Sequence, residues 1–459
     1  MNDYMNFLKK KQIKFEPSGL TVKKESLNSM LFPFQADLVD WSLKKGKSCI
    51  FADCGLGKTP MQLEWAEQIC RKHNSSKILI LAPLAVSRQT KREGDKFGIK
   101  VNICNHQEDV KPGVNITNYE KMHHFNSSEF RGLVLDESSI LKSFTGKIRS
   151  QIIELYADVP YKLACTATPS PNDYMELGNH SEFLGVMTRT EMLAMFFVHD
   201  GSDVSKWRLK GHAQDKYWEW LSSWAVVLRS PSDLGYEDNG FILPPLTINT
   251  HYVNAAVDDE YLFAMNVNTL AERRKARKLS LIDRVELIAT KVNKSTESAL
   301  IWCDYNAESE MLKNTIHDAV EVKGPDTIEH KENAMLGFAS GEVRVMVTKP
   351  SIAGYGMNWQ VCHQMAFCGL SDSYEQYYQA IRRCWRFGQQ KPVTVDVVIS
   401  ENEETVLQNI RRKEADAMRM AEHMVKYTHG YIEKDIHQTD RRKNKYKTNQ
   451  KMEAPKWAM

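Results

Sequence analysis

The segment Ala-Asp-Cys-Gly-Leu-Gly-Lys-Thr, residues 52–59, has the residue types that bind phosphate. It follows a short apolar run and precedes a helical pattern, and the order strand, glycine-rich loop, helix is the setting that a phosphate loop requires. Gly55 and Gly57 would let backbone N–H groups approach a β-phosphate. Lys58 would place its ammonium group between the β- and γ-phosphates, and the hydroxyl of Thr59 would bind Mg²⁺. The segment therefore predicts a site for a nucleoside triphosphate with Mg²⁺.

Two adjacent carboxylates, Asp136 and Glu137, follow the apolar run that ends at Leu135. At the end of a parallel strand they would face the nucleotide, with Asp136 holding Mg²⁺ directly or through water and Glu137 polarising the attacking water. An acidic pair after a strand can also be an ordinary polar turn, and the phosphate loop has Ala52 where the stricter pattern has Gly. The two motifs together favour the catalytic interpretation. Thr-Ala-Thr-Pro, residues 166–169, follows a further apolar run, where its hydroxyl groups could link the two sites by hydrogen bonds or simply form a turn.

Two arginines far along the chain, Arg383 and Arg386, offer a second set of phosphate ligands. They lie three residues apart on a predicted helix, so both would project from one face. A guanidinium group carries a fixed charge and a planar fork that suits phosphate oxygens, and an arginine finger contributes about 10³–10⁵ in rate to phosphoryl transfer. They would reach the γ-phosphate only when two parts of the chain close on each other, which would tie hydrolysis to movement. The alternative to an arginine finger is a cationic helix face that binds solvent or acidic neighbours, and this interpretation suits Arg382 well.

The elements that position these residues follow from the apolar pattern. Two parts of the chain alternate short apolar runs with helical patterns, which is typical of parallel α/β domains. The predicted strands of the first part are residues 48–53, 77–83, 114–119, 132–137 and 162–168, and those of the second are 298–304, 343–349, 363–369 and 393–399. We therefore expect an α/β fold with two lobes and a cleft between them.

These patterns divide the chain into five predicted parts. They are an N-terminal extension (1–30), a first lobe with the nucleotide site (31–184), a Trp-rich helical insertion and linker (185–245), a second lobe (246–425) and a basic C-terminal tail (426–459). Tyr217, Trp218, Trp220 and Trp224 recur at helical spacing in the insertion, which favours a packed helical element over a base-stacking wedge. The tail holds nine Lys and Arg residues against four acidic ones, so it could bind phosphates or form a solvated, partly disordered terminus.

Composition narrows the class of protein. The chain has 459 residues, enough for two or three domains, and its 61 basic and 58 acidic residues give a net charge of +3, which is too small to indicate nucleic acid by itself. No run approaches the roughly 18 apolar residues of a membrane span, and the start lacks the features of a secretory signal, so we expect an intracellular soluble protein. Nine scattered cysteines without a CxxC pair favour free thiols over a zinc site.

The ordered set of motifs resembles superfamily 2 helicases and, within them, the SWI/SNF-type double-stranded DNA translocases. The resemblance covers roughly residues 30–410 and is most specific in Gln-Ala-Ile-Arg-Arg-Cys-Trp-Arg-Phe-Gly-Gln, residues 379–389, which is close to the signature QAxxRxxRxGQ. Phe-Pro-Phe-Gln, residues 32–35, lies just ahead of the phosphate loop, and the resemblance implies that Gln35 reads the adenine of ATP. Residues 299–303 resemble the strand that opens the second lobe.

The resemblance also implies contacts with nucleic acid. Ala82-Pro83-Leu84 and Thr117-Asn118-Tyr119-Glu120 match first-lobe segments that touch the DNA backbone, and Lys142 corresponds to a lysine that continues the acidic box of the family. Residues 354–358, Gly-Tyr-Gly-Met-Asn, resemble the glycine-rich segment that links DNA to nucleotide, where the family usually has GGxGLN. The residues that we expect to bind nucleic acid are Thr117, Tyr119, Lys142 and Asn358, and the one that we expect to contact the nucleotide is Gly356.

The fold that the resemblance implies is two tandem RecA-like lobes with ATP bound between them, in an enzyme that hydrolyses ATP to ADP and phosphate. With ATP and Mg²⁺ it would move along double-stranded DNA, which stimulates the hydrolysis. Two alternatives stay open: a helicase that separates strands of DNA or RNA, and a nucleotide-gated nucleic acid clamp with weak hydrolysis. Ser139 favours the clamp, because the family usually has His at this position. The short chain is closest in kind to bacteriophage and prokaryotic members, so we expect a monomer in the cytoplasm of a bacterial or phage-infected cell.

Overall fold

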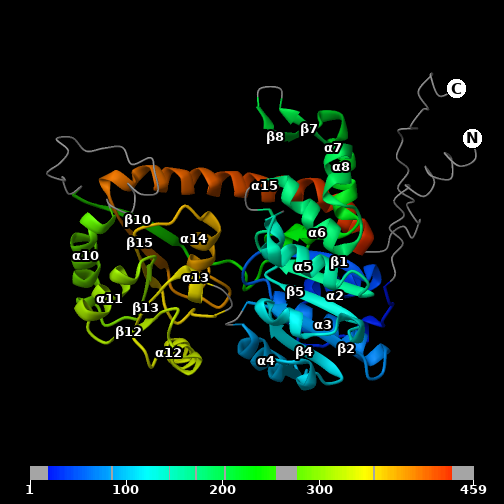
Figure 1. Cartoon of the computed structure of the whole chain (residues 1–459), viewed down its shortest axis with the longest axis horizontal. Coiled ribbons are helices and arrows are strands. Elements are labelled where there is room, and N and C mark those ends of the chain that lie inside the picture. Colours follow the sequence, from blue (N-terminus) through cyan, green and yellow to red (C-terminus); the bar gives the residue numbers. More distant parts are fainter. Residues whose placement is uncertain are drawn as a thin grey trace, which may run out of the picture.

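Two parallel sheets, each with helices on both faces, form two lobes that lie side by side (Figure 1). The computed structural model describes residues 19–83, 86–143, 145–170, 173–200, 203–254, 277–354 and 357–436. The predicted fold class is confirmed, because every strand pair within the two sheets is parallel.

The first lobe is built on a seven-stranded sheet of order β3-β4-β2-β5-β6-β1-β9. Its strands are β1 (Lys47–Ala52), β2 (Lys77–Ala82), β3 (Val101–Ile103), β4 (Gly113–Asn118), β5 (Gly132–Asp136), β6 (Tyr161–Thr166) and β9 (Ala225–Leu228). All five strands predicted for this lobe are present, because a strand buried on both faces leaves a continuous apolar run in the sequence. Two strands of this sheet were not predicted, β3, which has only three residues, and β9.

Helices cover both faces of this sheet and enclose two hydrophobic cores, one on each face. The helices are α2 (Pro33–Lys45), α3 (Lys58–Lys72), α4 (Ser87–Lys96), α5 (Lys147–Leu155), α6 (Leu177–Leu184), α7 (Arg189–Phe196) and α8 (Gln214–Ser222). Leu20 and Leu27 belong to the second of these cores, so the end of the predicted N-terminal extension packs against the lobe.

The Trp-rich stretch is part of the first lobe rather than a separate insertion. Strand β9 pairs with β1 at the edge of the sheet, which carries the lobe past the predicted boundary at residue 184. Tyr217, Trp218, Trp220 and Trp224 are all buried in the core, so their predicted packing role is confirmed. The stretch is also not purely helical, because β7 (Phe197–Asp200) and β8 (Asp203–Leu209) form an antiparallel hairpin that projects beside α7 and α8 (Figure 1).

The second lobe is built on a six-stranded sheet of order β10-β15-β14-β11-β13-β12. Its strands are β10 (Leu246–Val253), β11 (Ala299–Cys303), β12 (Ala319–Val322), β13 (Val345–Thr348), β14 (Gln364–Cys368) and β15 (Val393–Ser400), and its helices are α10 (Leu281–Asn293), α11 (Asn306–Thr315), α12 (Ile328–Ser340), α13 (Pro350–Ala353) and α14 (Tyr374–Ile381). The four predicted strands are confirmed. The two that were missed, β10 and β12, lie at the edges of the sheet, where partial exposure breaks the apolar run.

The last helix, α15 (Glu404–Ile436), begins in the second lobe and runs across to the first (Figure 1). Its first turns contribute Val406, Leu407 and Ile410 to the core of the second lobe, and its later turns contribute Met424 and Ile432 to the two cores of the first. The basic tail predicted from residue 426 therefore begins inside a packed helix, and residues 437–459 lie outside the described part of the chain. Among the described helices, none combines the length and the apolar character that a membrane span needs.

Candidate active site

The phosphate loop joins the end of β1 to the start of α3, as the sequence predicts. Gly55 and Gly57 both have positive φ, at 93° and 78°. A Cβ atom at Gly57 would lie 2.2 Å from Nε2 of Gln35, and one at Gly55 would lie 2.9 Å from the backbone nitrogen of Phe387 in the second lobe. Both positions therefore need glycine for conformation and for space. The Lys58 ammonium group donates a hydrogen bond of 3.0 Å to the carbonyl of Ala52, which folds this side chain back over the loop.

Gln35 ties the loop to the segment before α2. Its side-chain oxygen accepts a hydrogen bond of 3.0 Å from the backbone N–H of Phe32, and its side-chain nitrogen donates one of 3.0 Å to the carbonyl of Leu56. The side chain is buried, lines the cavity described below and keeps one N–H for a further acceptor. This position at the end of the phosphate loop is compatible with the predicted contact to a nucleobase.

The acidic pair lies at the carboxyl end of β5, beside the phosphate loop. Gln62 on α3 donates a hydrogen bond of 2.8 Å to Asp136 Oδ1. Burial and the neighbouring Glu137 charge raise the pKa of Asp136 to about 6. Glu137 has a left-handed backbone with φ of 55°, and its Oε2 accepts a 3.4 Å hydrogen bond from Thr166 Oγ1. Thr166 therefore contacts the acidic pair, and its predicted part in linking two sites stays a prediction.

Behind the acidic pair lies a histidine that was not among the predicted site residues. His180 on α6 is buried, and its Nε2 atom is 3.0 Å from the hydroxyl of Ser138. Burial lowers the pKa of His180 to about 4, so the imidazole is neutral at physiological pH. The chain thus has Ser139 at the end of its acidic box and supplies a histidine next to that box from a helix much further along the sequence.

The two arginines lie in a turn and not on a helix, which corrects the prediction. Helix α14 ends at Ile381, and beyond it the carbonyl of Arg383 accepts a hydrogen bond of 2.9 Å from the N–H of Trp359. Arg383 donates hydrogen bonds to Gln379 and to the carbonyl of Met357, whereas Arg386 donates one, to the same carbonyl.

The charge of Arg386 is poorly compensated in this turn. Burial, together with the adjacent Arg383 charge, lowers the pKa of Arg386 to about 10. Among the described residues, no carboxylate forms an ion pair with either Arg383 or Arg386. A buried guanidinium group without an anionic partner is unfavourable, so the turn favours binding of an anion.

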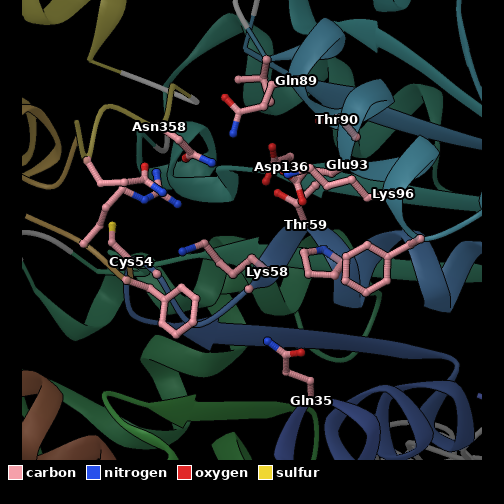
Figure 2. Close-up of a pocket in the computed structure, with 18 of the residues that line it drawn as sticks. Gln35, Cys54, Lys58, Thr59, Gln89, Thr90, Glu93, Lys96, Asp136 and Asn358 are labelled. Carbon is pink, nitrogen blue, oxygen red and sulfur yellow. The ribbon is translucent and has the colours of Figure 1, made fainter. Parts of the chain in front are cut away.

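The phosphate loop, Gln35, the acidic pair and the two arginines meet in one cavity of about 320 Å³ between the lobes. Its lining includes ten of the residues predicted for the site, namely Gln35, Gly55, Gly57, Lys58, Thr59, Asp136, Glu137, Asn358, Arg383 and Arg386. Figure 2 shows Lys58, Thr59 and Asp136 around the same space, with Asn358 reaching it from the second lobe. The volume suits a small ligand, and glycines, cations and an acidic pair together suit a triphosphate with a divalent cation.

Comparison with known families agrees with this arrangement. The SNF2-related domain matches residues 34–196, which hold the phosphate loop and the acidic pair, and the helicase conserved C-terminal domain matches residues 278–388, which hold the arginine turn. The chain belongs to the SWI2/SNF2 family of superfamily 2 ATPases. These two domains imply ATP hydrolysis.

Among solved structures, the chain is similar to the SWI2/SNF2 ATPase core of Sulfolobus solfataricus in complex with double-stranded DNA. The two share 16% sequence identity with a TM-score of 0.43, over 91% of this chain and 99% of that chain. No curated protein matches the sequence.

The residues that this SWI2/SNF2 chain was predicted to offer to nucleic acid lie in three different settings. Thr117 and Tyr119 are each 2% exposed, so against our prediction their side chains present no surface to a ligand in this structure. The Tyr119 hydroxyl donates a hydrogen bond of 2.7 Å to the carbonyl of Asp136, so this residue supports the acidic pair from behind. Asn358 lines the cavity between the lobes, and Lys142 forms an ion pair with Glu375 of the second lobe. Gly356 and Leu84 lie outside the described residues.

An aromatic wall at one end of the cavity was also missed. Phe32 of the first lobe, Phe241 of the linker and Phe387 of the second lobe all line the cavity and contact one another, with ring centroids 4.8 Å apart for Phe241 and Phe387 and 5.1 Å apart for Phe32 and Phe241. The three residues come from segments far apart in the sequence, so only the fold reveals the group.

Proposed function

We propose that this SWI2/SNF2 ATPase couples hydrolysis of ATP, bound with Mg²⁺, to movement along double-stranded DNA. The observation that carries the proposal is the composite cavity. Lys58 and Thr59 of the first lobe and Arg383 and Arg386 of the second line the same space, so a triphosphate there would touch both lobes. A ligand that binds both lobes favours the arrangement in which they are together.

In this proposal each polar group of the cavity has one role. Lys58 binds the β- and γ-phosphates, and Thr59 and Asp136 would hold Mg²⁺, which would neutralise charge on the phosphate oxygens. Glu137 accepts the proton of a water molecule that forms a new bond to the γ-phosphorus as the bond to the β-phosphate oxygen breaks. Arg383 and Arg386 stabilise the charge on the transferred phosphoryl group. The raised pKa of Asp136 supports a cation site, because burial and the Glu137 charge outweigh the nearby positive charge of Lys58.

The double-stranded DNA substrate rests on the family and on the motifs that resemble its translocases. Movement would follow from alternation between closed lobes with ATP and open lobes after release of products. Contacts to phosphates are sufficient for this, since a motor that steps along any sequence needs no base-specific contacts. We retain the expectation of a monomer that acts in the cytoplasm of a bacterial or phage-infected cell.

The experiment that tests the proposal compares nucleic acids as activators. ATP hydrolysis is measured with duplex DNA, single-stranded DNA and RNA, and the best activator is then used in strand-displacement and triplex-displacement assays. We expect duplex DNA to stimulate hydrolysis and a third strand to be displaced without separation of the duplex. Separation of the duplex would instead indicate a strand-separating helicase, and tight DNA binding without stimulated hydrolysis would indicate a clamp.

Two variants control for a contaminating ATPase. Lys58→Ala removes the phosphate-loop ammonium group, and Glu137→Gln keeps the size of the side chain but removes its basicity. Each is expected to lower the turnover number by a factor of about 10² or more with the fold intact. Unchanged turnover in either purified variant would defeat the assignment of the site.

A further inference from the structure

An ion pair links the first residue after β1 to the residue that precedes the arginine turn. Asp53 of the phosphate loop binds the guanidinium group of Arg382, and the hydroxyl of Tyr378 donates a second hydrogen bond to the same carboxylate. The N–H of Cys54 donates a third, of 2.6 Å. This cluster of Asp53, Tyr378 and Arg382 joins the two lobes beside the nucleotide cavity.

Arg382 is held firmly on its own side of the cleft. It is 5% exposed, and its guanidinium group lies 5.4 Å from the ring centroid of Tyr378 and 4.8 Å from that of Trp385. The Trp385 indole donates a hydrogen bond of 2.7 Å to the carbonyl of Pro244 in the linker. The Arg382 side chain is therefore held in one position, with its guanidinium group facing the phosphate loop.

The electrostatic balance of the pair favours the docked arrangement. Burial alone would raise the pKa of Asp53, but the charge of Arg382 and the hydrogen bonds outweigh it and hold this pKa below its ordinary value. The same carboxylate holds the pKa of Arg382 above its ordinary value, against the effect of burial. Both groups are therefore charged at neutral pH, and separation of the lobes would leave Arg382 without its partner.

The position of this pair in the sequence gives it a consequence for the reaction. Asp53 opens the loop that carries Lys58, and Arg382 is followed at once by Arg383 and, four residues after Arg382, by Arg386. Among the described residues, two further ion pairs cross the cleft, Arg88 with Glu332 and Lys142 with Glu375, but neither adjoins the phosphate loop or the arginine turn. A contact that fixes residue 53 to residue 382 fixes the distance between the two sets of phosphate ligands.

We propose that Asp53, Tyr378 and Arg382 are positioning residues of the ATPase reaction, which dock the arginine turn of the second lobe onto the phosphate loop of the first. Arg383 and Arg386 then reach the γ-phosphate only while this pair is formed. The proposal rests on the proposed function for the reaction that it serves, whereas the docking itself does not depend on hydrolysis.

The test is a double-mutant cycle on the full chain with Asp53→Asn, Arg382→Ala and both together, measured with ATP and the best nucleic acid activator. We expect each single variant to lower kcat by about 100-fold, as a small misplacement of a catalytic group does, with ATP affinity nearly unchanged. The double variant should lose no more than either single variant, because one interaction is removed in all three. Arg88→Ala breaks an ion pair across the same cleft and serves as the matched control, with kcat close to that of the wild type.

Amide hydrogen exchange measures the docking without hydrolysis. Arg382→Ala and Asp53→Asn should both increase exchange in residues 53–57 and 383–388 together, whereas Arg88→Ala should not. Losses that multiply in the double variant, equal losses of kcat and ATP affinity, or unchanged exchange in these two segments would overturn the proposal. A wild-type protein that hydrolyses no ATP would overturn the proposed function, and the exchange experiment would still decide the docking. If Arg382→Ala does not fold, Asp53→Asn and Arg382→Lys carry the same test.

Discussion

Gln62 holds Asp136 through a hydrogen bond of 2.8 Å between its carboxamide nitrogen and Asp136 Oδ1, and both side chains are buried. This bond favours the charged carboxylate, but burial and the adjacent Glu137 outweigh it and raise the pKa of Asp136 to about 6. The acidic pair is thus arranged for a cation at some cost in stability, which is typical of a functional site.

This cost predicts that Asp136→Asn stabilises the ligand-free protein in a pH-dependent way. Because the pKa of Asp136 is raised on folding, its contribution to stability is intact below about pH 4 and is lost as pH rises through about 6. The Asn variant has no charge to bury, so at pH 8 it should melt about 2–4 °C above the wild type, the shift that about 1 kcal/mol gives in a lobe of this size. Thermal unfolding at pH 5 and pH 8 measures this.

The matched control is Glu154→Gln, which neutralises an exposed carboxylate on α5. Its melting temperature should differ from the wild type by the same small amount at both pH values. A stabilisation by Asp136→Asn that does not grow between pH 5 and pH 8 would contradict the raised pKa.

The predicted site residues whose position in the fold follows from the sequence are those with a local cause. Gly55, Gly57 and Lys58 were recognised because a strand, a glycine-rich loop and a helix follow one another directly, and Asp136 because it ends an apolar strand. The fold of the arginine turn was not predictable in this way. In this turn the carbonyl of Arg383 accepts a hydrogen bond from the N–H of Trp359, which belongs to a different segment of the chain.

The burial of individual side chains and the contacts between the lobes also could not be predicted from one sequence. Motif resemblance placed Tyr119 on the DNA, but the residue faces the core of the first lobe and binds Asp136 from within. The partners Asp53 and Arg382 are more than 300 residues apart, and the sequence around either residue does not indicate that the two form an ion pair. Such pairs depend on how the lobes dock, and that information is absent from spacing and periodicity.

The two arginines of the turn should differ when each is replaced by alanine. Arg383 makes three hydrogen bonds within the second lobe, so Arg383→Ala should lower both kcat and the melting temperature. Arg386 makes one such bond and its pKa is lowered to about 10, so Arg386→Ala should lower kcat by about 10³-fold or more without destabilising the ligand-free fold. Turnover, ATP affinity and thermal unfolding of both variants measure this difference. Equal loss of kcat and ATP affinity in Arg386→Ala would argue against its role as an arginine finger.

The ion pair between Lys142 and Glu375 yields a prediction for DNA binding. Lys142 is 38% exposed and its charge is engaged by Glu375 across the cleft. If Lys142 binds a DNA phosphate, Glu375→Gln should free it and steepen the plot of log affinity against log salt concentration by up to about one unit. Duplex DNA binding measured between low and moderate salt tests this.

The variants of Lys142 supply the control for this effect. Lys142→Ala should flatten the same plot, and the double variant should behave as Lys142→Ala alone, because the lysine is the group that contacts phosphate. A Glu375→Gln variant with an unaltered salt dependence would indicate that Lys142 serves only to hold the lobes together.

The end of the chain allows packing and charge to be separated by two truncations. In α15 the ring of Tyr427 stacks on Trp218 with centroids 5.4 Å apart, and Ile432 is 1% exposed. Truncation after Lys426 removes both contacts, so it should destabilise the first lobe by about 3 kcal/mol or more. Truncation after Ile436 keeps them and removes only a basic segment that includes Arg441, Arg442 and Lys443.

Comparison of the two truncations decides whether the basic segment binds DNA. If it contacts phosphates, the protein cut after Ile436 should melt like the full chain but bind duplex DNA more weakly, with a shallower dependence on salt. If the segment is only a solvated terminus, affinity and salt dependence should both be those of the full chain. Any weaker binding seen only in the protein cut after Lys426 would then come from loss of packing between α15 and the first lobe.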